Sequence, residues 1–299
     1  MRKGTLLPIL MVLGAALLLL SLLAPGAPAA SGHERTYAVK AEETIQKTFT
    51  LPVGHKTLDV DNVFGSIEVV GGGSNEVQIT VTKTIRAESD ADVERAKKEV
   101  TLDMQQKDGD VKLYVDGPFR CQCHCDDCRG SHDDRNYIVQ MDFKIQVPAE
   151  IDVRARTVNS GSVTVKNVTG DFSVHNVNGR IEMSAIAGSG SATTVNGPVR
   201  VSFRQNPGKS SGFKTINGDV ELKFAQGLSA DFRLKTFNGG IYTDFPVTAL
   251  PAQPVSEERR GGKLILRADR SAGARIGAGG PEIQIENLNG DIRILENHE

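Results

Sequence analysis

The sequence predicts an all-β fold of the β-solenoid or β-roll type with one short helix. The chain has 299 residues with 31 glycines, no tryptophan, 4 tyrosines and 11 phenylalanines, so its core must rest mainly on Val, Ile and Leu. The β-branched residues favour strands. Apolar and polar residues alternate along several segments, as in half-buried strands. A short unit centred on glycine, most often Asn-Gly, also recurs through the chain.

Residues 1–30 have the three-part plan of a secretory signal peptide. Arg2 and Lys3 precede an apolar, leucine-rich stretch over 6–23, and small or turn-forming residues fill 24–30. This plan predicts export with cleavage at the end of the segment. A retained signal anchor is the alternative, because the apolar stretch is close to the length that spans a bilayer. No second apolar run is long enough to do so, so no membrane span is expected after signal cleavage.

The rest of the chain, residues 31–299, is expected to be one exported β-repeat domain. It carries a Cys-rich insertion at 116–136 and a Pro-rich loop at 244–262. The formal net charge is −2 and no run of Lys or Arg stands out. Nucleic-acid-binding proteins carry a basic patch, so no nucleic acid partner is expected.

Strands and one helix precede the repeat. The alternation of apolar and polar residues predicts strands over 43–60 (with a turn at 52–54), 76–85, 111–115 and 137–147. Residues 89–100 predict the helix, because Ser89 or Asp90 can cap it and its basic residues come late, as the helix dipole prefers. Near the C-terminus, 263–267 predicts another strand and 271–281 another loop.

The repeat occupies the chain from residue 157 onward, and an earlier copy stands at 62–69. Apolar residues stand two positions before the glycine (−2) and two and usually four positions after it (+2, +4), which predicts one inward face. Position −3 is Asn or Thr except in the first copy of the main array, where Ser160 inserts and shifts Thr157 back by one. These side chains could form hydrogen-bonded ladders if copies stack. Asn-Gly tolerates positive φ, so the chain can turn there. The turn glycines are Gly65, Gly161, Gly170, Gly179, Gly197, Gly218, Gly239 and Gly290.

The glycine spacing distinguishes two architectures. Glycines from Gly161 to Gly197 recur every nine residues, whereas Gly197, Gly218 and Gly239 lie twenty-one apart. A coil of roughly 20 residues with two short strands fits both spacings. An antiparallel β-sandwich of hairpins, the alternative, accounts for the nine but not for the twenty-one. We therefore predict the solenoid.

These repeats resemble the bacterial putative-adhesin family, a domain of unknown function with repeated Asn-Gly or Gly-Asp β-strands, similar to the head domains of autotransporter adhesins. The resemblance covers about residues 43–295, less the insertion at 116–136. It includes the dipeptides Gly170-Asp171, Gly218-Asp219 and Gly290-Asp291. It implies an all-β, right-handed helix-like fold, export, and adhesion or scaffolding. The family carries no established catalytic residues, so none can be transferred.

All four cysteines lie in one short segment, and two histidines lie near them. The candidates for disulfide bonds or metal binding are Cys121, Cys123, Cys125, Cys128, His124 and His132. In an oxidising compartment the preferred interpretation is two disulfides that staple a loop. Thiolates and imidazoles also suit zinc, and the spacing of Cys125 and Cys128 allows both to bind one ion. No cofactor is expected, with zinc at this cluster and redox-active thiols as the alternatives.

Enzyme motifs are weak. Gly208–Gly212 matches the G-x-S-x-G pattern, but no helix follows the serine, as a nucleophile elbow requires. A calcium-binding roll needs an aspartate in each copy, and within the nine-residue spacing only Asp171 supplies one. No enzyme is predicted, and a carbohydrate-active solenoid is the alternative, although its carboxylates have no recognisable spacing.

The sequence therefore predicts an exported, non-catalytic, adhesin-like β-repeat protein that acts as a binding or scaffold module at the cell envelope. It is expected in the periplasm or at the cell surface, with an unidentified envelope or surface protein or glycan as its partner. The alternative is a metal-binding or thiol-redox protein that acts through the Cys121–Cys128 loop.

Overall fold

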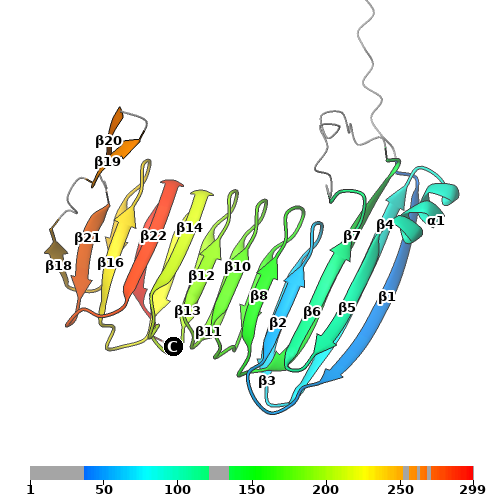
Figure 1. The fold of residues 1–299 in the computed structure, drawn as a ribbon, viewed down its shortest axis with the longest axis horizontal. Coiled ribbons are helices and arrows are strands. Elements are labelled where there is room, and N and C mark those ends of the chain that lie inside the picture. The colour runs from blue at the N-terminus through cyan, green and yellow to red at the C-terminus, as the bar shows by residue number, and fades with distance from the viewer. Residues whose placement is uncertain (1–36, 121–134, 252–255, 261–262, 268–270, 299) are drawn as a thin grey trace, which may run out of the picture. The chain divides into compact units, whose positions relative to one another are not determined.

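The computed structural model describes residues 37–120, 135–251, 256–260, 263–267 and 271–298. In these residues the chain forms strands and one helix, α1 (Asp90–Glu99), which confirms the predicted fold class (Figure 1). Sheet A has 10 strands in the spatial order β1 (Val39–Thr50), β4 (Glu76–Ala87), β7 (Tyr137–Pro148), β3 (Ile67–Gly72), β9 (Val163–Lys166), β11 (Ile181–Ile186), β13 (Val199–Phe203), β15 (Val220–Phe224), β23 (Ile292–Glu296) and β17 (Ile241–Thr243). Sheet B has 11 strands in the order β18 (Val247–Leu250), β21 (Ala272–Ile276), β16 (Ala230–Lys235), β22 (Glu282–Asn289), β14 (Ser211–Asn217), β12 (Gly190–Thr193), β10 (Phe172–His175), β8 (Asp152–Arg156), β2 (Thr57–Asp61), β6 (Asp110–Asp116) and β5 (Thr101–Lys107). β19 (Ser256–Arg260) and β20 (Lys263–Arg267) form a separate two-stranded sheet.

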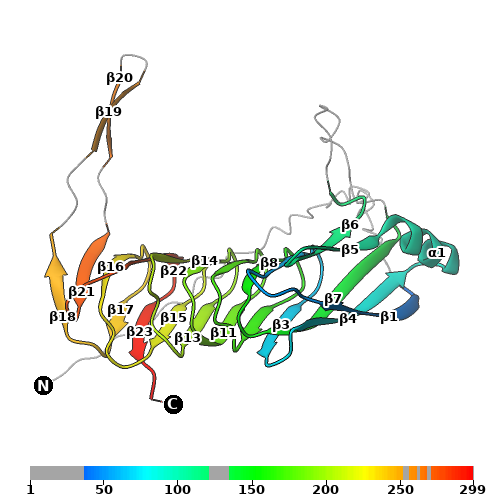
Figure 2. The same ribbon diagram turned by 60° about the horizontal axis from the view of Figure 1, so that its bottom comes forward.

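The repeat winds alternately through the two sheets. Each coil from β8 to β15 places one strand in sheet B and the next in sheet A, and strands of successive coils pair in parallel. In sheet B, Val153 pairs with Phe172, Phe172 with Gly190 and Ala192 with Phe213, which are 19, 18 and 21 residues apart. A coil of about 20 residues with two strands is therefore confirmed. Figure 2 shows sheet A strands along one side and sheet B strands along the other.

The spatial order of the last coils departs from the sequence order. β22 and β23 lie between the coil of β14 and β15 and the coil of β16 and β17, although they come last in the chain. At the other end, β1, β4 and β7 pair antiparallel in sheet A. The segment 271–281, expected to be a loop, contains β21, because its small residues fit a strand and its positive-φ glycines, such as Gly277, come only after that strand ends. β18 and β19 lie within the predicted Pro-rich loop 244–262.

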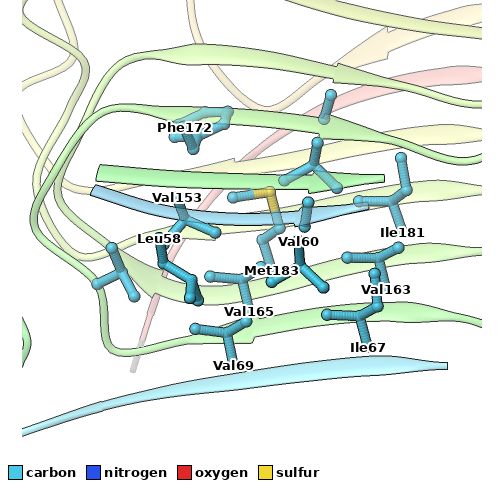
Figure 3. Packing of buried hydrophobic residues seen from close by; sticks show 14 of the residues in the cluster. Leu58, Val60, Ile67, Val69, Val153, Val163, Val165, Phe172, Ile181 and Met183 are labelled. Atoms are coloured by element: carbon cyan, nitrogen blue, oxygen red, sulfur yellow. The ribbon is translucent and has the colours of Figure 1, made fainter. Parts of the chain in front are cut away.

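The inward face of each copy differs from the prediction at one position. Positions +2 and +4 are buried, as at Ile181 and Met183, and their side chains meet those of sheet B in the core (Figure 3). Position −2 is exposed in some copies, since Phe237 is 74% and Leu288 is 44% exposed, although Val168 of the Gly170 copy is buried. The Asn-Gly turn interrupts the period-2 alternation, so the residue that faces inward before the turn is the polar one at −3.

The buried −3 side chains join neighbouring coils. Thr157 takes this place in the first copy of the main array, where the inserted Ser160 shifts it to −4. Asn62 donates to the carbonyl oxygen of Met141 at 2.9 Å, and the others donate to the carbonyl oxygen of the turn glycine in the adjacent coil. The pairs are Thr157 to Gly65 (2.9 Å), Asn176 to Gly161 (3.0 Å), Thr194 to Gly179 (2.9 Å), Thr215 to Gly197 (2.8 Å) and Asn287 to Gly218 (2.8 Å). These bonds satisfy polar groups that burial would otherwise leave at a cost.

Phenylalanines fill the core from β10 to β16, where the sequence suggested mainly aliphatic residues. The ring-to-ring contacts follow one another as Phe172–Phe213 (6.3 Å between centroids), Phe213–Phe203 (6.1 Å), Phe203–Phe224 (5.1 Å) and Phe224–Phe232 (5.8 Å). The pairs lie within the range of favourable aromatic contacts. Phe213–Phe203 and Phe224–Phe232 are contacts between a ring of sheet B and a ring of sheet A, so the row ties the two sheets together.

The predicted helix is confirmed. Ser89 caps α1 by accepting a hydrogen bond from the backbone N–H of Asp92. Val93 and Ala96 are buried, and the helix packs against β1, β4 and β7. At its C-terminal end the buried Lys83 donates to the carbonyl oxygen of Val100 at 2.6 Å. None of the residues described here belongs to a helix long and apolar enough to span a membrane.

Tyr137 makes the attachment of α1 depend on pH. Its hydroxyl donates to the Glu99 carboxylate, and burial together with this bond raises the pKa of Tyr137 from 10.0 to about 12. The unfolded chain then binds fewer protons than the folded chain between these values, so stability present below pH 10.0 is lost as pH rises toward about 12. We expect Tyr137→Phe to flatten this alkaline loss in urea unfolding measured across pH.

The matched control is Tyr242→Phe, because Tyr242 is 54% exposed. It should keep the pH dependence of the parent chain. An unchanged alkaline slope in Tyr137→Phe would contradict the assignment.

Candidate functional site

Charged side chains form a row across the outer face of sheet A. Glu182 of β11, Arg200 of β13, Glu221 of β15 and Arg293 of β23 are register partners on adjacent strands. They alternate with buried residues along each strand and therefore point outward. Adjacent strands lie about 4.8 Å apart, so the row presents a regular alternation of negative and positive charge.

A groove of about 940 Å³ lies over three residues of this row, Glu182, Arg200 and Glu221. Its lining includes Glu182, Arg200, Arg204, Glu221, Lys223 and His298. The chain after β23 closes one end, where Asn297 donates its backbone N–H to the carbonyl oxygen of Phe224 at 2.7 Å and its side-chain amide to the Ser202 hydroxyl at 3.3 Å. β11 is irregular beside the groove, since its register against β13 shifts between Met183 and Ile186.

The charges in the groove are free to exchange partners. Glu182 and Arg180 approach to 3.7 Å, as do Glu221 and Lys223, and all four side chains are partly exposed. Exposed pairs of this kind contribute little to stability. Arg200 makes no ion pair with any residue in the described part of the chain. A ligand could therefore replace water and weak ion pairs here without disrupting the fold.

A row of asparagines runs along the turns at position −1, with Asn159 at −2 because Ser160 is inserted there. Each side-chain amide donates to the side-chain oxygen of the next, and all are exposed except the half-buried Asn159. The hydrogen bonds are Asn178 to Asn159 (2.7 Å), Asn196 to Asn178 (2.8 Å), Asn217 to Asn196 (2.7 Å), Asn289 to Asn217 (2.8 Å) and Asn238 to Asn289 (2.8 Å). The ladder expected at −3 thus lies at −1, because the −3 side chains point into the core and bond to backbone. We call this row the Asn ladder.

The aspartates that follow the turn glycines have a structural role. Asp171 accepts from the backbone N–H of Ser189 at 3.2 Å, and Asp219 from that of Asp291 at 2.9 Å. The hydrogen bond from Lys209 lowers the pKa of the Asp171 carboxyl. Across the ranges that the structure describes, no three His, Cys, Asp or Glu side chains come together as a cation site.

The structure places the remaining predicted site residues as follows. The turn glycines lie where the chain passes from a strand of one sheet to a strand of the other. Gly65, Gly197, Gly218 and Gly290 have positive φ. Ser210 precedes the strand β14, so no helix follows it. Cys121, Cys123, Cys125, Cys128, His124 and His132 lie outside the described residues, so their disulfide or zinc chemistry stays a prediction.

Sequence reasoning missed the groove. Most of its charged residues stand at the outward positions +3 and +5 of the repeat, whereas the inward positions define the repeat. In the copies around Gly179, Gly197, Gly218 and Gly290, position +3 holds Glu182, Arg200, Glu221 and Arg293. That alternation was a usable signal, but only with the spatial order of the coils, which puts Arg293 next to Glu221.

Comparisons with known proteins identify a family and three similar folds. A family model described as Toastrack DUF4097 matches residues 50–295. None of the curated proteins matches the chain. One similar solved structure is a putative cell adhesion protein from Clostridium sporogenes, with 11% identity and a TM-score of 0.43, covering 86% of this chain and 100% of that one. Another is a putative adhesin from Bacteroides fragilis, with 10% identity and a TM-score of 0.38, covering 85% of this chain and 97% of that one. A putative adhesin from Parabacteroides distasonis has 13% identity and a TM-score of 0.21 over similar shares, 85% and 97%.

Proposed function

We propose, on the premise that this chain belongs to the Toastrack DUF4097 family, that it is a non-catalytic binding module of the cell envelope. Its ligand would lie in the sheet A groove. The observation that carries the proposal is the alternating row of Glu182, Arg200 and Glu221 at the floor of that groove. Export to the periplasm or the cell surface rests on the predicted signal peptide at 1–30.

The chemistry of the groove favours a protein ligand. Charged groups of both signs stand on adjacent strands, and such an array is complementary in charge to an extended segment that carries both signs. Recognition of sugars usually depends on exposed aromatic rings. The phenylalanine in the lining, Phe203, is fully buried in the core and offers no such surface.

The lining gives no support to a hydrolytic role. A serine nucleophile needs an adjacent base. Within the described part of the chain, Ser202 is bonded to the Asn297 amide and not to a histidine. The groove therefore offers binding groups without the pairing that activates a serine.

The test is binding of a soluble extended peptide in which Glu and Lys alternate, separated by Ser. We expect the full chain to bind it in a salt-sensitive manner, and Arg200→Glu to weaken binding by about tenfold, since one attractive charge becomes repulsive. Fluorescence anisotropy measures the dissociation constant.

The matched control is Arg154→Glu. Arg154 is an exposed arginine on the outer face of sheet B, and its replacement should leave binding unchanged. Equal binding by both variants would place the ligand elsewhere. If the chain bound a glycan array but no peptide, the proposed ligand would be a glycan and not a protein.

A further inference from the structure

The two sheets end at different places beyond the last coil. Sheet A ends at β17, whereas sheet B continues past β16 with β21 and β18. Since β16 and β17 are the two strands of one coil, two strands of sheet B have no counterpart in sheet A. Figure 1 shows β21 and β18 beyond β16. We call these two strands the overhang.

In the described part of the chain, most of the inward face of the overhang is apolar and exposed. Ala272 and Ala274 of β21 are register partners of Leu234 and Phe232, the buried inward residues of β16. In β18, Ala249 pairs with Ala274, and Val247 pairs with Ile276, which is buried. Val247 is 51% exposed, and Ala249 and Ala272 are exposed as well. The equivalent residues one strand earlier, in β16, are buried, so among the residues that the structure describes the core is open beyond Ile276 at this end.

The last strand of sheet A is open in the same place. Ile241 holds the +2 position and is 39% exposed, whereas the other copies bury the residue at this position. The carbonyl of Gly240 and the N–H of Asp244 bond to β23. Because bonding alternates along a parallel strand, the backbone groups of Ile241 and Thr243 point away from β23, toward the missing strands.

Charge distinguishes these edges from those at the other end. The outermost strands there carry charged residues, which protect exposed edges from pairing: Lys40, Glu42, Glu43 and Lys47 in β1, and Asp103 and Lys107 in β5. β17 (Ile-Tyr-Thr) and β18 (Val-Thr-Ala-Leu) carry none. The open end therefore lacks the feature that prevents strand addition.

We infer that a second copy of this chain occupies the open end. Two strands are missing from sheet A, and a second copy supplies two, its own overhang. A two-fold axis parallel to the strands would place the partner's β18 beside β17, and the same contact would form a second time in the other copy. The two apolar inward faces would then cover each other, as the self-complementary contact of a symmetric dimer requires.

The strand directions agree with this arrangement. β18 and β16 are both antiparallel to β21, so they run in the same direction. The chain turns back between β16 and β17, so these two strands run in opposite directions. A two-fold axis parallel to the strands preserves direction, so the partner's β18 would run antiparallel to β17 and could form a regular ladder with it.

The test is sedimentation equilibrium of the full chain over a range of concentrations. We expect a monomer–dimer equilibrium. Val247→Lys places a charge on the inward face of the overhang and should weaken the dimer at least about tenfold. Thr248→Lys is the matched control, because the next residue of the same edge strand is also exposed but points to the outer face. It should leave the dimer intact.

A backbone variant tests the pairing separately. Thr243→Pro removes an N–H that faces away from β23, so the chain should fold but lose the dimer. Urea unfolding checks that the fold is retained.

A monomer at every concentration, or a dimer that survives both Val247→Lys and Thr243→Pro, would overturn the inference. Hydrogen exchange at Thr243 then identifies what covers the edge in the monomer. Slow exchange would indicate a segment of the same chain, such as the β19–β20 hairpin, and fast exchange would indicate an edge left for a different protein.

Discussion

Replacing Gly218 by alanine is expected to lower the free energy of unfolding by roughly 2–4 kcal/mol. Gly218 has φ +151°, and a Cβ built on it would lie 2.3 Å from the carbonyl oxygen of Gly197 in the adjacent coil. The carbonyl oxygen cannot easily move away, because it belongs to the backbone and accepts a hydrogen bond from the Thr215 hydroxyl. Side chains rarely adopt such a φ, and the coils would have to separate to admit the methyl group.

The effect should extend beyond one coil. Gly290 stands against Gly218 in the same way, with a built Cβ 2.2 Å from the Gly218 carbonyl oxygen. Urea unfolding followed by circular dichroism measures the loss. The control is Gly212→Ala in β14, where no atom lies within 4 Å of the added group. Equal losses from the two variants would show that close coil packing is not the reason for glycine at the turns.

The second large effect is expected from Phe224→Ala, at roughly 3–5 kcal/mol. Phe224 is fully buried, stacks on Phe203 with centroids 5.1 Å apart, and meets Phe232 edge to face at 5.8 Å. Removing its ring leaves a cavity between the sheets and ends two aromatic contacts. Because the rings on either side belong to different sheets, the cavity cannot close without moving the sheets together.

Thermal and urea unfolding measure this loss. Phe237→Ala is the matched control, since Phe237 is 74% exposed and its removal should change stability little. Phe224→Leu should cost less than Phe224→Ala, because it keeps most of the apolar volume. A loss as large in Phe237→Ala would mean that the aromatic contacts do not hold the two sheets together.

The repeat made much of the fold predictable. Each copy carries its own strand pattern and turn, so the two-strand coil and its length followed from local residues. The position of α1, outside the main array of copies, followed from its own capping and charge pattern. Membership of the Toastrack DUF4097 family confirms the resemblance to a bacterial domain of unknown function with glycine-centred strands. The burial of Asn and Thr at −3 could not be predicted in this way. A strict period of two assumes that the alternation continues through the turn, but the Asn-Gly kink breaks it at Gly179 and its equivalents.

The order of the coils could not be predicted. The copy at 287–294 has the same apolar and turn residues as the others, so nothing local indicates that it lies between the coils that contain Gly218 and Gly239. The groove and the open end both depend on that order. Arg293 extends the charged row only because β23 follows β15, and β17 is an edge only because β23 has taken the inner position.

The Asn ladder has an electrostatic direction. Every hydrogen bond in it is donated toward the β3 end, from Asn238 through Asn289 to Asn159, which accepts the last one. Aligned hydrogen bonds polarise one another, so the row behaves as a line of aligned dipoles along the stacking axis, comparable to the peptide dipoles of a helix. Its acceptor end is the oxygen of Asn238, directly before β17, which gives the open end a partial negative charge without any ionised side chain.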